Sequence, residues 1–198
     1  MTKIVIGRES HGIKARHVSP TYQDGNGDQV IVGTNYPMPI EDHFSANLHL
    51  GNAYSFGALN DFSNLLGSGN SLDIAIAFGS GTEANMSIEG LCGGDAEGFL
   101  YEGATVTGGT AGTAVNLNRV STNTSNSAIL VNPTVTSVGT LLGKYIIIGG
   151  TGKKAAGGDM AGSQLIMKPL TTYLLRLTNV NGTNHVAEIV ITWFEQEI

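Results

Sequence analysis

The chain has 198 residues, a formal net charge of −6 and one cysteine, Cys92. A chain of this length can bury one substantial core. The acidic balance argues against a nucleic-acid-binding protein, which needs a basic face. One cysteine excludes both an intrachain disulfide and a thiolate metal cluster, and we interpret Cys92 as a small buried side chain.

Charged residues are scarce, because they make up 13% of the chain, about half the usual share in a soluble domain. Monomers stay soluble by carrying many mixed surface charges, whereas subunit interfaces are depleted in Lys, Glu and Asp. The composition therefore favours a protein that places much of its surface against other subunits. A secreted sandwich domain rich in Thr and Asn is the alternative.

Residues 1–50 are polar and hold four of the five histidines, and we expect an extended arm with one early strand at Lys3–Ile6. The opening "MTKIVIGRES" is too short and too charged for a signal peptide, and no apolar run reaches the length of a membrane span. The first 16 residues carry a net charge of +3. This basic start is either a contact for an acidic partner or a solvated tail, and its basic residues are Lys3, Arg8, Lys14 and Arg16.

From residue 51 onward apolar and polar residues alternate, and Gly, Asn, Asp or Pro interrupts the pattern at short intervals. This spacing predicts an all-β fold, an antiparallel two-sheet β-sandwich of jelly-roll type over residues 51–198. Leu72, Ile74, Ile76 and Phe78 should share one face. Residues 53–62 fit a strand or a short helix. The other expected strands are 72–78, 84–90, 97–103, 114–120, 127–135, 144–150, 164–168, 173–179 and 186–195.

The turn "VNGTN" at residues 180–184 suggests that the last two strands form a hairpin. A three-residue loop would place Arg176 opposite Glu188, so that the two charges form a structural pair. The other face would then be wholly apolar, with Tyr173, Leu175 and Leu177 beside Ala187, Ile189 and Ile191.

The stretch "IIIGGTGKKAAGG" at residues 146–158 resembles the start of a phosphate-binding loop. A Walker A loop needs Gly, four residues, and then Gly-Lys-Ser/Thr. Here Lys154 follows the Gly152–Lys153 pair, and Ile147 stands where the first glycine is required. We therefore expect no nucleotide. Lys153 and Lys154 remain candidate contacts for an acidic neighbour, or they touch nothing.

Motifs for catalysis or metal binding are also incomplete. The chain has no G-x-S-x-G elbow, and its histidines lack metal-ligand spacing. "DGNGD" at residues 24–28 resembles a calcium loop, but Gln29 stands where the loop needs glycine. The carboxylate pairs Asp95/Glu97 and Glu41/Asp42 are interpreted as structural. No catalytic residue, cofactor or metal site is predicted.

The order of six segments, within residues 51–195, resembles tailed-bacteriophage capsid decoration proteins, the cement or head-stabilising proteins of jelly-roll type. These segments are "GDAEGFLYEGATVTGGT" (94–110), "NLNRVSTNTS" (116–125), "NPTVTSVGTLL" (132–142), "GGTGKKAAGG" (149–158), "LIMKPLTTYLLRLTN" (165–179) and "ITWFE" (191–195).

The resemblance implies a non-enzymatic virion protein, made in the host cytoplasm, that binds the outer surface of an assembled capsid. Its partner would be the major capsid protein. Proteins of this kind link neighbouring capsomers and commonly act as homotrimers. The basic residues named above are the candidate capsid contacts. One alternative is a tail, fibre or baseplate component that binds a host-surface glycan, and another is a sandwich enzyme acting on glycosides.

Overall fold

The computed structural model describes residues 21–23, 29–31, 43–149, 156–159 and 164–198. The chain divides into two compact units, Met1–Asp42 and His43–Ile198. In the first unit β1 (Thr21–Gln23) pairs with β2 (Gln29–Ile31) in an antiparallel ladder. The strand expected at Lys3–Ile6 lies outside the described residues.

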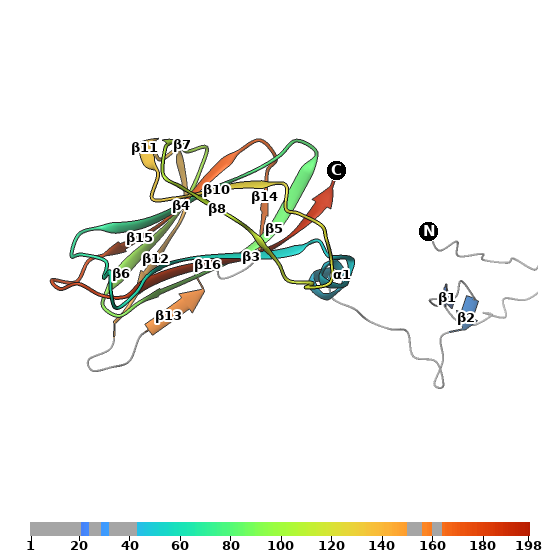
Figure 1. Cartoon of the computed structure of the whole chain (residues 1–198), viewed down its shortest axis with the longest axis horizontal. Coiled ribbons are helices and arrows are strands. Elements are labelled where there is room, and N and C mark those ends of the chain that lie inside the picture. Colours follow the sequence, from blue (N-terminus) through green and yellow to red (C-terminus); the bar gives the residue numbers. More distant parts are fainter. Residues whose placement is uncertain (1–20, 24–28, 32–42, 150–155, 160–163) are drawn as a thin grey trace, which may run out of the picture. The chain divides into compact units, whose positions relative to one another are not determined.

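The second unit is an all-β sandwich, as predicted, and its described residues form two six-stranded antiparallel sheets (Figure 1). The first sheet contains, in spatial order, β12 (Thr140–Ile147), β6 (Ala96–Glu102), β15 (Thr172–Asn179), β4 (Ser71–Phe78), β10 (Ser127–Val131) and β8 (Thr110–Gly112). The second contains β13 (Ala156–Asp159), β5 (Thr82–Cys92), β16 (Ala187–Glu197), β3 (Ala53–Asn60) and β9 (Val115–Asn116), with β14 (Leu165–Met167) also paired to β5. A small separate ladder joins β7 (Thr105–Thr107) and β11 (Thr134–Ser137).

The long strands pass back and forth between the two sheets. In chain order β3, β4, β5 and β6 alternate between the second and the first sheet. Later in the chain β12 lies in the first sheet, β13 and β14 in the second, β15 in the first and β16 in the second. This alternation is the connectivity of a jelly roll. Because consecutive strands face each other across the core, each one turns its apolar side towards the other sheet.

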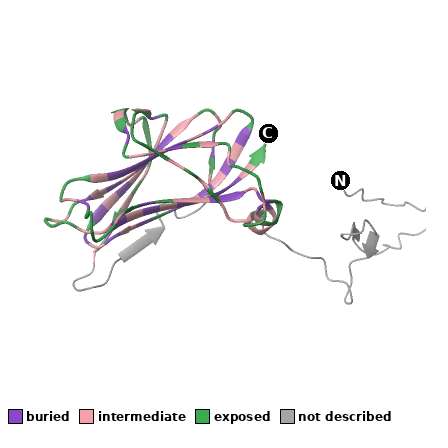
Figure 2. Cartoon of the chain, in the orientation of Figure 1, coloured by how far each residue is buried: buried purple, intermediate pink, exposed green. Residues whose placement is uncertain are grey.

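The core lies between the sheets, where Figure 2 shows the buried residues. Leu72, Ile74, Ile76 and Phe78 are all buried on one face of β4, which confirms the predicted alternation. Trp193 of β16 is fully buried and meets the Phe78 ring edge-on, with 6.2 Å between ring centroids. Cys92 is likewise buried, as expected for a small packing residue.

The predicted hairpin between the last two strands is wrong. β15 pairs with β4 and β6 in the first sheet, whereas β16 pairs with β3 and β5 in the second. Arg176 therefore lies opposite Asp73, not Glu188, and Glu188 lies between Leu59 and Leu91. Both strands have one apolar face, and a sandwich buries these faces by stacking them across the core instead of aligning them side by side.

The expected extended arm to residue 50 is also corrected, because His43–Leu50 form a helix, α1, that belongs to the sandwich unit. Phe44 packs edge-on against Phe194, with 6.4 Å between ring centroids. The helix ends at Leu50 because Gly51 has a φ of +76°, a left-handed conformation typical of the residue after a helix.

The structure also decides two of the strand predictions, those for residues 53–62 and 114–120. The ambiguous segment 53–62 forms the strand β3, and the strand expected over residues 114–120 shrinks to β9, which is followed by turns.

Candidate functional site

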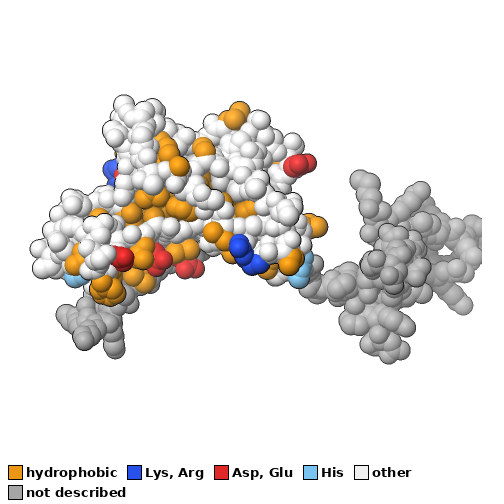
Figure 3. Space-filling model, in the orientation of Figure 1, with side chains coloured by type: hydrophobic (Ala, Val, Ile, Leu, Met, Phe, Trp, Pro, Cys, Tyr) orange, Lys and Arg blue, Asp and Glu red, His pale blue; other side chains and the backbone are white. Residues whose placement is uncertain are grey.

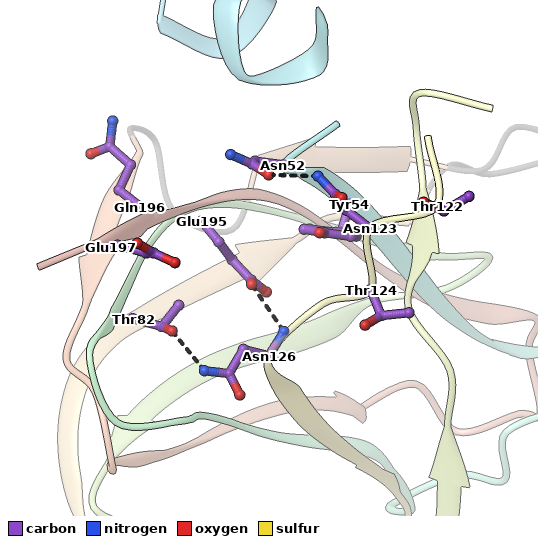
Figure 4. Close-up of a pocket in the computed structure, with 10 residues that line it drawn as sticks. All are labelled: Asn52, Tyr54, Thr82, Thr122, Asn123, Thr124, Asn126, Glu195, Gln196 and Glu197. Atoms are coloured by element: carbon purple, nitrogen blue, oxygen red, sulfur yellow. Dashed lines mark hydrogen bonds between the residues drawn. The ribbon is translucent and has the colours of Figure 1, made fainter. Parts of the chain in front are cut away.

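A polar pocket of about 670 Å³ opens at one end of the sandwich (Figure 4). This volume falls within the range of small-molecule sites. We call it the end pocket. Its walls come from the start of β3, the start of β5, the loop between β9 and β10 and the end of β16. The lining residues are Asn52, Tyr54, Thr82, Thr122, Asn123, Thr124, Asn126, Glu195, Gln196 and Glu197.

Asparagine side chains at the end of β9 and in the loop after it hold one wall of the end pocket against α1 and Gly51. Asn118 donates through Nδ2 to the carbonyl of His49 at 3.0 Å, and Asn123 Nδ2 donates to the carbonyl of Leu50 at 3.3 Å. Asn116 Nδ2 donates to the carbonyl of Gly51 at 2.8 Å. The last carbonyls of a helix have no partner within the helix, so these amides both satisfy them and fix the loop.

Glu195 anchors the other end of the same loop. Its carboxylate accepts hydrogen bonds from Ser125 Oγ, from the Asn126 backbone N–H at 2.9 Å and from Trp193 Nε1 at 3.0 Å. Asn126 Nδ2 also donates to Thr82 Oγ1 at 2.7 Å, which ties the loop to β5. Figure 4 shows Glu195 and Asn126 meeting across the end pocket. The Glu195 carboxylate is therefore largely occupied by the protein itself.

Tyr54 forms part of the pocket wall and is almost completely buried, with 2% of its surface exposed. Its ring packs against Trp193, with 5.9 Å between the centroids. Burial and the neighbouring negative charge of Glu195 raise the pKa of Tyr54, so the hydroxyl stays protonated and able to donate. Among the described residues, none forms a hydrogen bond with this hydroxyl.

The lining of the end pocket sets the chemistry that it can support. Its described residues carry amides, hydroxyls and two carboxylates, but no Lys, Arg, His or Cys. Among these lining residues there is therefore no Cys–His or Ser–His pair of nucleophile and base. In the described part of the chain, no three His, Cys, Asp or Glu side chains gather as a metal site. The pocket is suited to hydrogen-bonding a ligand.

A second surface lies on the outer side of the first sheet, where β12 is the edge strand. Leu141 lies opposite Tyr101, Lys144 opposite Phe99 and Ile146 opposite Glu97, and partners of this kind share a face. We call this surface, together with Ile148, the β6–β12 face. Ile146 and Ile148 are 74% and 72% exposed.

The aromatic and charged residues of the β6–β12 face contact one another. The rings of Phe99 and Tyr101 stack with 5.9 Å between centroids, and Lys144 Nζ lies 5.3 Å from the centre of the Phe99 ring. The same Nζ forms an ion pair with Glu97 at 2.8 Å. The β6–β12 face therefore exposes mainly aromatic and aliphatic side chains. Its one lysine among these residues, Lys144, is already paired with Glu97.

The residues predicted as capsid contacts all lie outside the described residues, so the structure assigns them no position: Lys3, Arg8, Lys14, Arg16, Lys153 and Lys154. Of the predicted structural pair, Arg176 lies beside Phe99 on the neighbouring strand, and Glu188 lies on the outer face of the other sheet. The end pocket was not predicted from the sequence, although the run at residues 116–126 is rich in asparagine and threonine, residues that commonly form hydrogen-bonding loops.

No family model, no curated protein and no solved structure matches this chain. Among the described residues, the structure contains no helix with the length and apolar character needed to cross a membrane. The fold and these two surfaces therefore define the class of protein, an antiparallel β-sandwich with a polar end pocket and an apolar sheet edge.

Proposed function

We propose that the protein is a non-enzymatic structural component of a phage virion that binds the outer surface of an assembled capsid and bridges its capsomers. Its partner is the major capsid protein, and it acts as a homotrimer. The observation that carries the proposal is the β6–β12 face, where large apolar side chains stand exposed on an edge strand.

The charges near the β6–β12 face support a protein contact there. Lys144 is paired with Glu97, and Arg176 is paired with Asp73 on the same side of the sheet. Burying this surface against another protein would therefore bury few unpaired charges, whose desolvation is costly. Aromatic residues and a depletion of charge are features of the centres of protein interfaces.

The shape of the edge strand favours contact through side chains. The register of β12 against β6 shifts between Leu141 and Gly143, which marks a β-bulge or a similar irregularity. Bulges and edge lysines, here Lys144, protect sheet edges from pairing with other edges. The backbone edge of β12 is thus protected from pairing with another strand, whereas its apolar side chains remain exposed and able to contact a partner protein.

The visible surface also agrees with a protein that assembles with others. Figure 3 shows a described body that is mostly white, with few charged side chains and a band of apolar side chains across its middle. A surface with little charge is poorly suited to a monomer that must remain soluble alone.

The test is to incubate the purified full chain with undecorated phage heads and, separately, with host cells. We expect saturable binding to heads, at a copy number that follows the symmetry of the shell. Saturable binding to cells without binding to heads would contradict the proposal and support the tail, fibre or baseplate alternative. Sedimentation of the free protein tests the trimer.

A further inference from the structure

We propose that the end pocket is a binding site for an uncharged saccharide. This inference does not rest on the capsid role, because the end pocket and the β6–β12 face are built from different residues. It rests on the charge of the pocket wall, on the hydrogen-bonding groups left available there and on the hydroxyl of Tyr54, which has no partner among the described residues.

The charge of the wall selects against anions. The described lining contains two carboxylates, Glu195 and Glu197, and no cationic side chain. A phosphate, a sulfate or an acidic sugar would meet negative charge without a compensating Lys or Arg. An uncharged ligand avoids this repulsion and can still donate hydrogen bonds to the carboxylate of Glu197.

The loop amides present acceptors to the pocket because their donors are used elsewhere. Asn126 gives its Nδ2 to Thr82, and Asn123 gives its Nδ2 to Leu50 and Asn52, so each keeps its Oδ1 as an acceptor. Two of these bonds, Asn126 to Thr82 and Asn123 to Asn52, are drawn in Figure 4. The side chains of Thr124 and Gln196 form no hydrogen bond with the described residues and supply groups that both donate and accept.

A saccharide matches this mixture of groups. Each sugar hydroxyl donates one hydrogen bond and accepts others, so neighbouring hydroxyls can use donors and acceptors that alternate along a wall. The wall of the end pocket offers both kinds of group, acceptors on Asn126 and Glu197 and groups that donate and accept on Thr124 and Gln196.

The hydroxyl of Tyr54 supports the proposal independently of the charge and the amide groups of the wall. Its side chain is 2% exposed and lines the pocket, yet its hydroxyl has no hydrogen-bond partner among the described residues. The hydroxyl oxygen is not one of the buried polar atoms that lack a partner, so it is accessible from the pocket although the ring is buried. A ligand hydroxyl can therefore accept a hydrogen bond from Tyr54, whose polar tip is available while its ring stays packed.

Two other ligand classes fit the end pocket less well. A divalent cation needs several free oxygen ligands, but Glu195 already accepts three hydrogen bonds from the protein. A nucleic-acid base would need an exposed aromatic face for stacking. The pocket offers only Tyr54, whose ring is packed against Trp193.

The experiment titrates the full chain with maltotriose, lactose and triacetylchitotriose, and with sialyllactose as an anionic counterpart, using saturation-transfer NMR and calorimetry. We expect at least one neutral sugar to bind at millimolar concentration or below, and sialyllactose to bind more weakly than lactose. Tyr54→Phe should weaken binding about five- to tenfold, because it removes one hydrogen bond and keeps the ring on Trp193. Tyr101→Phe, on the β6–β12 face, is the matched control and should bind as the wild type does.

Three outcomes would overturn the proposal. They are the absence of binding by every neutral sugar, unchanged binding in Tyr54→Phe, and binding of Ca²⁺ that Glu197→Gln abolishes while no sugar binds. Near-ultraviolet circular dichroism confirms that each variant is folded. Capsid binding is measured separately, so that failure of the saccharide site is distinguishable from failure of the capsid role.

Discussion

Arg176 and Asp73 lie opposite each other on β15 and β4 and form a two-pronged ion pair, with Nε 2.8 Å from Oδ1 and Nη2 2.6 Å from Oδ2. Their side chains are 26% and 10% exposed, so both charges are partly removed from water. The hydrogen bonds to Asp73 raise the pKa of the Arg176 guanidinium. This pair connects two central strands of the first sheet.

Replacing Asp73 with Asn should lower the free energy of unfolding by about 1–3 kcal/mol, because Arg176 would keep its charge without a charged partner. Urea denaturation measures the change. Glu97→Gln breaks the more exposed pair with Lys144 and should cost only about 0–1 kcal/mol. Glu188→Gln should change stability by no more than about 0.5 kcal/mol, since Glu188 is not the partner of Arg176. Equal losses in the three variants would contradict this account.

The sequence predicted the sandwich correctly because strand alternation is a local property. The face made by Leu72, Ile74, Ile76 and Phe78 follows from a period of two residues, whatever the strand pairs with. The pairing itself is not local. "VNGTN" is a good hairpin turn, but here the chain uses residues 180–186 to cross from one sheet to the other. Turn residues alone do not distinguish these two outcomes.

The end pocket could not be predicted from sequence for a related reason. Its walls come from positions as far apart as Asn52, Thr82, Asn126 and Glu197, which meet only after both sheets have formed.

Helix α1 was easier to predict from the sequence than the end pocket. Asp42 before it and Gly51 after it are ordinary start and stop signals for a helix, but the polar composition of the first 50 residues hid them.

Gly139 and Gly103 provide a matched test of the junction between β6 and β12. Both have positive φ, +80° and +77°, but a Cβ on Gly139 would lie 2.2 Å from the carbonyl oxygen of Glu102, whereas one on Gly103 would meet nothing within 4 Å. Gly103→Ala should therefore cost about 1–2 kcal/mol from backbone strain alone. Gly139→Ala should cost about 4 kcal/mol or more, because backbone must also move. Thermal denaturation of both variants checks the order, and a larger loss in Gly103→Ala would refute it.

Tyr173 should make the protein less stable at alkaline pH. It is buried, accepts from the Lys168 backbone N–H at 2.9 Å and donates to Glu102 at 3.0 Å. Burial is the main cause that raises the pKa of Tyr173 to about 12. The pKa of tyrosine in the unfolded chain is about 10. Between pH 10 and pH 12, Tyr173 therefore keeps its proton in the folded state and loses it in the unfolded state. The stabilisation is thus complete below pH 10 and is lost as the pH rises towards 12.

The measurement compares the wild type with Tyr173→Phe in urea at several pH values from 8 to 12. Other titrating groups cancel in the difference between the two proteins. We expect the stability advantage of the wild type to shrink by an amount on the order of 1 kcal/mol per pH unit above pH 10. A difference that stays constant across this range would show that Tyr173 does not retain its proton.

Ile146 and Leu59 test which side of the sandwich contacts the capsid. Each is an exposed apolar residue, at 74% and 60%, and each lies opposite a glutamate, Glu97 for Ile146 and Glu188 for Leu59. Replacing either one with Lys should leave stability within about 0.5 kcal/mol, since both sites face solvent and offer a nearby carboxylate. Ile146→Lys places a strongly hydrated charge within the β6–β12 face, and its desolvation should weaken binding to undecorated heads about tenfold or more. Leu59→Lys should bind heads as the wild type does. The two affinities come from co-sedimentation with heads, and a greater loss in Leu59→Lys would move the contact to the other sheet.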